Sequence, residues 1–159
     1  MLTIREATVA DAVLVSELIL ELDDFQKGSE QVQTTEIDIS RDGFDTNPQF
    51  RALIAEWHGQ PAGFAVYFSY YSTWRGAGLY LEDLFVRPEF RGRGIGTALL
   101  APVARSAEQE NRNFIRGAVL NWNQPAFDLY KTLGVCFLED GRTVLLTGDG
   151  LRKLAAQDS

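Results

Sequence analysis

The chain has 159 residues, of which 45% are hydrophobic and 23% charged, and this composition is typical of one globular domain with its own core. Its formal net charge of −7 disfavours nucleic acid as a partner and mildly favours cationic small molecules, although many proteins are acidic for solubility alone. The single cysteine, Cys136, excludes an internal disulfide and a cysteine metal cluster, and it favours a cytoplasmic location. No apolar run approaches the ~20 residues of a membrane span, and residues 1–6 lack the layout of a signal peptide, so we expect no membrane partner.

The N-terminal third predicts a strand and two helices. Residues 2–5 alternate between apolar and polar types and predict the first strand. Thr8 or Asp11 can cap a first helix, and a second helix is expected from Thr35 to Arg41, with Gly43 as its stop. The apolar residues at helical spacing in the first helix are Ala12, Val15, Leu18, Ile19 and Leu22.

An antiparallel hairpin is expected next. Residues 50–57 and 62–71 are rich in apolar and aromatic types, and residues 58–61, His-Gly-Gln-Pro, separate them with a turn. The second strand and the loop after it carry a run of aromatic side chains, which belong either to the core or to the wall of a substrate site. These residues are Tyr67, Phe68, Tyr70, Tyr71 and Trp74.

The most informative stretch begins with residues 79–86, which are nearly all apolar and predict a buried strand. Glu82 and Asp83 interrupt this strand, and burying an unpaired charge costs several kcal/mol, so the pair needs a reason. Glycine then stands at every second position of the turn that opens the next helix: Gly92, Gly94 and Gly96. Such a turn presents backbone N–H groups and the positive end of the helix dipole to an anion.

The last third predicts a strand over residues 114–120 and a helix that Asn123 caps, with Pro125 in its first turn and Gly134 after its end. Two closing strands and a short helical tail complete the expected elements: 135–138, 143–147 and 150–156. Strands and helices alternate in the middle of the chain, and we therefore expect one mixed α/β domain, residues 1–159, with a central sheet flanked by helices.

Spacing excludes several common phosphate-binding and nucleophile motifs. No G-x-x-x-x-G-K-[ST] string occurs, and Thr97 stands where a dinucleotide fingerprint that starts at Gly92 needs its third glycine. No G-x-S-x-G, H-E-x-x-H or C-x-x-C string occurs either. His58, the one histidine, lies in the hairpin turn, and Cys136 is expected in the core. We therefore expect neither a metal nor a covalent nucleophile.

The pattern Arg91-x-x-Gly94-x-Gly96 after a carboxylate-bearing strand resembles the pyrophosphate loop [QR]-x-x-G-x-[GA] of the GNAT superfamily of N-acetyltransferases. The resemblance reaches the diamine and thialysine N-acetyltransferase branch and covers nearly the whole chain, at residues 4–7, 42–44, 70–76, 79–96, 118–124 and 128–131. Residues 71–76 and 151–154 look more like the thialysine side of that branch. It implies a mixed, mostly antiparallel twisted sheet whose splayed central strands hold acetyl-CoA as co-substrate. It also implies direct acetyl transfer, in a ternary complex, to a primary amine of a small cationic or amino-acid-like molecule, and a homodimer.

By the same resemblance, the acetyl-CoA contacts lie on the strand end, the glycine loop and the last long helix. Leu84 and Val86 would pair through their backbones with the pantetheine arm, which mimics an added strand. Arg91 and Arg93 either add charge near the phosphates or are merely solvated. The full expected set is Leu84, Phe85, Val86, Arg91, Gly92, Arg93, Gly94, Ile95, Gly96, Thr97, Asn123, Ala126 and Tyr130.

Two residues match catalytic positions of the family. Glu82 corresponds to the carboxylate that binds the ammonium and accepts its proton, directly or through water. Asp83 should point to the opposite face of a regular strand, and it can assist only if a bulge re-aims it. Tyr130 matches the tyrosine that protonates the leaving thiolate; without the resemblance it is equally well a core aromatic three residues after Phe127.

The expected substrate contacts are Phe25, Gln26 and Trp74, beside Glu82 and Asp83. Trp74 can stack on a cation or an alkyl chain. Family members commonly carry an acidic residue at the position of Gln26, so this neutral side chain disfavours spermidine-type substrates and favours thialysine or a lysine analogue. A protein-lysine acetyltransferase and a non-catalytic acyl-CoA-binding module are the alternatives.

Overall fold

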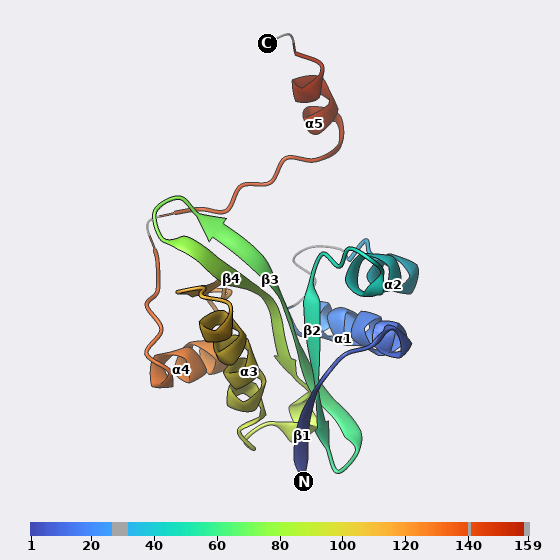
Figure 1. Cartoon of the computed structure of the whole chain (residues 1–159), viewed down its shortest axis with the longest axis vertical. Coiled ribbons are helices and arrows are strands. Elements are labelled where there is room, and N and C mark those ends of the chain that lie inside the picture. Colours follow the sequence, from blue (N-terminus) through green and yellow to red (C-terminus); the bar gives the residue numbers. More distant parts are fainter. Residues whose placement is uncertain (27–31, 140, 158–159) are drawn as a thin grey trace. The chain divides into compact units, whose positions relative to one another are not determined.

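The computed structural model describes residues 1–26, 32–139 and 141–157. These residues form two compact units, Met1–Leu129 and Tyr130–Ser159. The first unit contains the sheet and the helices that cover it, and the second contains the C-terminal segment (Figure 1). None of the described helices is long and apolar enough to cross a membrane.

The sheet of the first unit has five strands in the order β1-β2-β3-β4-β5. Its neighbouring strands run antiparallel, except that β4 and β5 are parallel, so the sheet is mixed and mostly antiparallel as expected. The strands are β1 (Leu2–Glu6), β2 (Arg51–Trp57), β3 (Gln60–Ser72), β4 (Gly76–Val86) and β5 (Ile115–Gly117).

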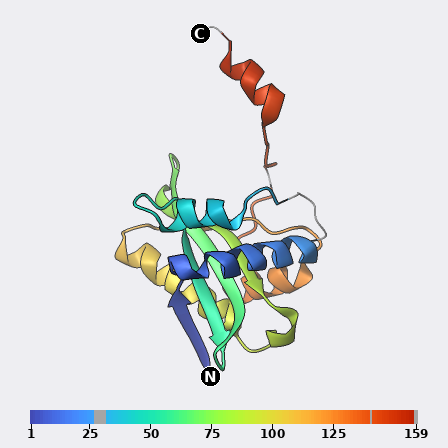
Figure 2. The ribbon, with the colours of Figure 1, turned by 90° about the vertical axis from the view of Figure 1, so that its right-hand side faces the viewer.

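Helices cover both faces of this sheet because its central strands alternate between two apolar faces. On β3, Ala65 and Tyr67 belong to a cluster with α3, whereas Phe64 and Val66 belong to a cluster with α1. Figures 1 and 2 show α1 and α2 on one face of the sheet and α3 on the other. These helices are α1 (Ala12–Phe25), α2 (Glu36–Phe44) and α3 (Ile95–Gln109), and short 3-10 turns precede α1 (Val9–Asp11) and follow β4 (Pro88–Phe90).

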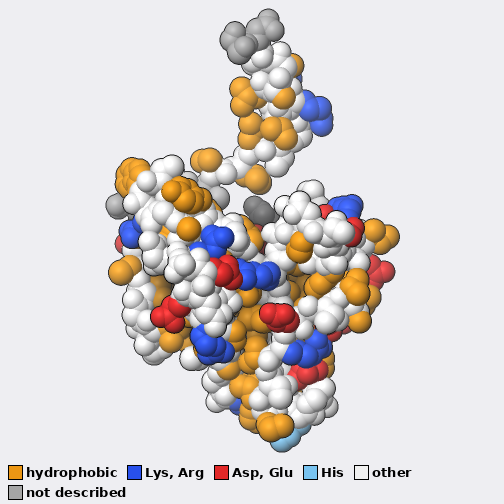
Figure 3. All heavy atoms as spheres, viewed as in Figure 1, with side chains coloured by type: hydrophobic (Ala, Val, Ile, Leu, Met, Phe, Trp, Pro, Cys, Tyr) orange, Lys and Arg blue, Asp and Glu red, His pale blue; other side chains and the backbone are white. Residues whose placement is uncertain are grey.

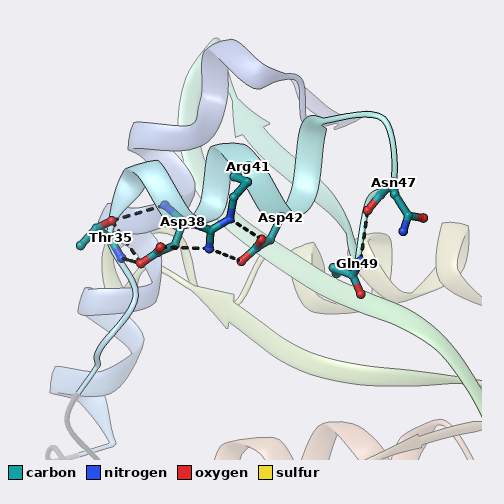
Figure 4. Close-up of polar contacts among 6 residues, drawn as sticks. All are labelled: Thr35, Asp38, Arg41, Asp42, Asn47 and Gln49. Atoms are coloured by element: carbon teal, nitrogen blue, oxygen red, sulfur yellow. Dashed lines mark hydrogen bonds and ion pairs between the residues drawn. The ribbon is translucent and has the colours of Figure 1, made fainter.

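The start of α2 is fixed by a reciprocal cap between Thr35 and Asp38 (Figure 4). The Asp38 backbone N–H donates to Thr35 Oγ1 at 3.3 Å, and the Thr35 backbone N–H donates to Asp38 Oδ2 at 2.9 Å. Arg41 then bridges Asp38 and Asp42 on the exposed side. The helix runs through Gly43 to Phe44 instead of stopping there. Gly43 makes room for the Phe50 ring, which lies 2.4 Å from where a Cβ would be.

The C-terminal segment differs from expectation. Helix α4 (Gln124–Thr132) begins in the first unit and ends in the second, and α5 (Gly148–Ala155) is the expected tail helix. The predicted closing strands over 135–138 and 143–147 are wrong: neither segment is a strand, because the described part of the second unit offers no neighbouring strand for its backbone groups. Most of their apolar side chains are exposed, namely Val135, Leu138, Val144, Leu145 and Leu146, and Figure 3 shows hydrophobic side chains along this segment.

Candidate active site

Strands β4 and β5 pair over only three residues and then part. Leu79, Tyr80 and Leu81 face Ile115, Arg116 and Gly117 in parallel register. Strand β4 continues to Val86, and on this side its last five residues have no strand partner among the described residues. The free backbone N–H and C=O groups there can pair with an extended ligand, as an added strand would. The splayed strands expected from the sequence are therefore β4 and β5, of which β5 is the edge strand of the described sheet.

A β-bulge lies at Glu82. In the pairing of β3 with β4, Val66 faces Asp83 and Tyr67 faces Leu81, so Glu82 is the extra residue. The Val66 side chain belongs to the apolar cluster on the α1 face, and Asp83 therefore points to that face too. The Glu82 side chain is exposed beside it. The bulge thus re-aims Asp83, which a regular strand would have separated from the site.

The two carboxylates influence each other. Burial, and after it the neighbouring charge of Glu82, raise the pKa of Asp83 to about 7. A carboxyl group with a pKa near neutrality can both accept and release a proton under physiological conditions. Asp83 is therefore suited to proton transfer, whereas on a regular strand it would have pointed away from the site.

The glycine loop leaves open space at the start of α3. Gly92 and Gly94 adopt φ angles of +78° and +76°, a left-handed conformation that side chains disfavour, and nothing lies within 4 Å of a Cβ built on either. Gly94 is the N-cap of α3, so the N–H groups of the first helical turn point into this space. This cradle favours an anion, because the backbone donors and the helix dipole both attract negative charge. The cradle residues are Gly92, Arg93, Gly94, Ile95, Gly96 and Thr97.

The arginines of this loop rest on aromatic rings. Arg91 Nε donates to the Val86 carbonyl at 3.0 Å, and its guanidinium lies 4.5 Å from the centre of the Phe25 ring. Arg93 lies 4.9 Å from the centre of the Trp57 ring. Both side chains thus already have partners, so the backbone of the loop is the better candidate for phosphate binding.

The structure places other expected residues on the same unit. Phe25, at the end of α1, packs against Phe85 and Trp122, with ring centres 6.2 and 5.8 Å away. Gln26 follows as the C-cap of α1. Leu84 and Val86 pack on the α3 side of the sheet, and the side chain of Asn123 accepts a hydrogen bond from the Ala126 N–H at 3.3 Å, which confirms the predicted cap of α4.

Two residues that the sequence assigned to the site, Trp74 and Tyr130, do not lie beside the carboxylates within the first unit. Trp74 lies in the turn between β3 and β4 and is 96% exposed. The six residue steps along β4 from Gly76 to Glu82 span about 20 Å at ~3.3 Å per residue, so Trp74 is remote from Glu82 of its own unit. Tyr130 belongs to the second unit, and burial raises the pKa of its hydroxyl.

Sequence reasoning gave no role to Arg116, which lies on β5 opposite Tyr80. The signal available in the sequence was a single cation inside a predicted strand. The described residues contain no group of three or more His, Cys, Asp or Glu side chains arranged to hold a metal ion.

Comparisons with known proteins show to which family the chain belongs. Residues 17–135 match the model of the Acetyltransferase (GNAT) family. The thialysine N-epsilon-acetyltransferase of Sus scrofa is 40% identical to the chain and that of Mus musculus is 39% identical, each alignment covering 97% of both proteins. The thialysine N-epsilon-acetyltransferase of Caenorhabditis elegans is 33% identical over 87% of each.

Solved structures share the fold. An integron cassette protein from the mobile metagenome of V. cholerae superposes with a TM-score of 0.79 at 24% identity and covers 98% of both chains. The ribosomal-protein-alanine N-acetyltransferase of Brucella melitensis biovar Abortus 2308 has a TM-score of 0.70 at 17% identity, over 93% of this chain and all of that one. The family model and the curated relatives together define an acetyl-transferring enzyme. The chain belongs to the GNAT family of acetyltransferases.

Proposed function

We propose that the enzyme transfers the acetyl group of acetyl-CoA to a primary amine of a small cationic or amino-acid-like molecule, such as thialysine, a lysine analogue or a diamine. The amine attacks directly in a ternary complex. The observation that carries this proposal is the position of Glu82 and Asp83 at a bulge, where the free edge of β4 begins. The relatives named thialysine N-epsilon-acetyltransferase support the choice of amine.

Acetyl-CoA supplies an acetyl group that is already activated as a thioester. The free edge of β4, from Leu84 to Val86, suits its pantetheine arm, and the cradle of residues 92–97 suits its pyrophosphate. Asn123 and Ala126, at the start of α4, belong to the proposed set because their capping bond orders the first turn of that helix. Phe85 and Arg91 contribute by holding the end of β4 against Phe25.

The difficulty of the reaction lies with the amine. A lysine-like amine has a pKa of ~10.4, so about one molecule in 2,500 is neutral at pH 7, and neutralising it costs roughly 4.6 kcal/mol. Glu82, which is exposed, binds the ammonium, and the carboxylate pair accepts its proton. The raised pKa of Asp83 makes that side chain a suitable second acceptor in the pair.

The remaining assignments complete the proposed site. Tyr130 acts as the general acid that protonates the departing thiolate, which requires the protonated phenol that its raised pKa preserves. Phe25 and Gln26 border the amine site at the end of α1. Trp74 stacks on the amine substrate. Because Trp74 is exposed and remote from Glu82 of its own chain, the substrate that it contacts is the one bound by the other subunit of the dimer.

We further propose that both units form one acetyltransferase domain, because the family match runs across the boundary between them. The enzyme acts as a homodimer, and the exposed aromatic side chains of the β3–β4 turn support this. Cys136 is exposed and not in the core as expected, and a cytoplasmic location suits such a free thiol.

The test is release of CoA thiol from acetyl-CoA by the full chain with thialysine, lysine, ornithine, putrescine, spermidine and a lysine-containing peptide. We expect the highest kcat/KM with thialysine or another free amino acid that carries a side-chain amine. Activity on the peptide alone would make the protein a protein-lysine acetyltransferase. Binding of acetyl-CoA without thiol release from any amine would make it a binding module.

A further inference from the structure

Arg116 is a strand arginine whose charge is not neutralised by a carboxylate of the described residues. A carboxylate does neutralise each of the other two arginines on described strands. Arg5 on β1 pairs with Asp11 at 2.8 Å, and Arg51 on β2 pairs with Glu110 at 2.6 Å. Arg116 Nη1 instead donates to the Tyr70 hydroxyl at 3.1 Å. A guanidinium has five N–H donors in a planar fork, so most of its hydrogen-bonding capacity is available to a ligand.

Aromatic rings hold this guanidinium in place. Its carbon lies 5.5 Å from the centre of the Tyr70 ring and 5.7 Å from the centre of the Phe114 ring. Phe114 is itself fixed over Gly78, where an added Cβ would lie 2.4 Å from the ring. The Arg116 side chain is half-buried, so its charge acts in a less polar setting than a solvated arginine would.

Arg116 lies on the same face of the sheet as the carboxylate pair. It is directly opposite Tyr80 in the parallel register, and residues opposite each other in a sheet point to one face. Tyr80 stacks on Phe68 and contacts Tyr70 on that face. The Glu82 charge raises the pKa of Tyr80 in addition to burial, whereas the Arg116 charge lowers it, so both charges lie within electrostatic reach of one phenol.

The separation of the two charges suits an amino acid. Glu82 is two residues along β4 from Tyr80, which corresponds to roughly 7 Å at ~3.3 Å per residue. The five bonds between the ε-nitrogen and the α-carbon of an extended lysine span roughly 6 Å, from bond lengths of about 1.5 Å. A cation and an anion at the two ends of one such molecule can therefore meet Glu82 and Arg116 together.

We propose that Arg116 determines specificity by binding the α-carboxylate of the amine substrate, so that the enzyme selects zwitterionic amino acids over diamines and polyamines. The guanidinium fork matches a carboxylate through two parallel hydrogen bonds. A diamine presents a second ammonium at this position, where Arg116 repels it. This inference rests on the proposed function, because it assumes that the amine binds at Glu82 and Asp83.

The test compares two substrates that differ only in the carboxylate, lysine and its decarboxylated analogue cadaverine, with wild-type enzyme and Arg116→Gln. We expect wild type to have at least tenfold higher kcat/KM for lysine than for cadaverine. Arg116→Gln should lower kcat/KM for lysine 10- to 100-fold, mainly through KM, and change that for cadaverine less than threefold or raise it. Arg116→Lys should keep part of the preference, because it retains the charge but not the fork.

Arg105→Gln on α3 is the matched control, since it removes an exposed arginine elsewhere on the unit, and it should leave both substrates unaffected. Equal kcat/KM of wild type for lysine and cadaverine, or an equal loss on both in Arg116→Gln, would overturn the role of Arg116. Activity on cadaverine verifies that each variant is folded. Absence of thiol release from every amine with wild type would instead refute the proposed function.

Discussion

Adjacent carboxylates in one site can divide the work of binding and proton transfer when their surroundings differ. Glu82 is exposed and meets the solvated ammonium first, whereas Asp83 is buried enough for its pKa to reach about 7. Burial destabilises the ionised carboxylate of Asp83, and the negative charge of Glu82 destabilises it further. Proton transfer to this pair therefore depends on both side chains.

Replacing Glu82 with Gln should raise the pH at which the enzyme is active. Without this carboxylate the reaction depends on amine that is already neutral in solution, and that fraction grows tenfold for each pH unit below a pKa of ~10.4. We expect kcat/KM for the preferred amine to fall about 100-fold at pH 7 and to recover toward pH 9. Glu89→Gln, an exposed change after β4, is the control. A wild-type pH profile in Glu82→Gln would refute the role.

Replacing Asp83 with Asn should change how stability depends on pH. The pKa of Asp83 is raised in the folded protein, to about 7 from 3.8, so the folded state binds more protons than the unfolded state between these values. The free energy of unfolding of wild type therefore falls as pH rises from about 4 to about 7. Asp83→Asn should remove this fall and be more stable than wild type at pH 8, by on the order of 1–3 kcal/mol.

Urea unfolding of both proteins at pH 5 and pH 8 measures this effect. Asp24→Asn, at an exposed position on α1, should show the pH dependence of wild type. If Asp83→Asn follows the wild-type curve at both pH values, Asp83 ionises normally in the folded protein.

At the scale of elements, local chemistry made some features predictable from sequence. The cap of α4 was predictable because Asn123 bonds to a residue only three positions away, and the glycine loop because its conformation demands glycine. The bulge at Glu82 was not, because it depends on how β3 aligns with β4. The predicted strand over residues 114–120 was too long for a similar reason. The neighbouring strand sets the length of β5, and β4 diverges from β5 after Leu81.

The glycine loop gives a prediction at this scale. Gly94→Ala places a side chain at φ +76° and in the cradle, where nothing now lies within 4 Å. The left-handed conformation costs about 1–2 kcal/mol for a side chain, and the methyl group obstructs the phosphates. We expect KM for acetyl-CoA to rise about tenfold, with KM for the amine changed less than twofold.

Gly59→Ala is the matched control for this variant. Gly59 has φ +79° with nothing within 4 Å, but it lies in the β2–β3 turn and is not one of the cradle residues 92–97. It should lose similar stability and keep the KM for acetyl-CoA. An equal rise of KM in both variants would show that strain, and not the cradle, is responsible.

At the scale of the whole molecule, several large apolar side chains are exposed on each of the two units. In the first unit, Trp74 is 96% and Tyr71 70% exposed at the β3–β4 turn. In the second unit, Val144 is 89% and Leu145 75% exposed. Contiguous exposed apolar patches commonly mark protein interfaces. Large aromatic anchors contribute most of the energy of such interfaces, so Trp74 is the residue to change.

We expect light scattering on the full chain to give about twice the monomer mass of 17.8 kDa at micromolar concentration. Trp74→Ala should weaken the dimer at least tenfold, because an interface tryptophan contributes about 2 kcal/mol or more. Ile37→Ser, which removes an exposed apolar side chain from α2 (71% exposed), should leave the mass unchanged. If the amine site draws Trp74 from a partner copy, Trp74→Ala should also raise KM for the amine in step with dissociation, and adding protein should restore it. A monomeric wild type with full activity would remove both the dimer and the shared tryptophan from the mechanism.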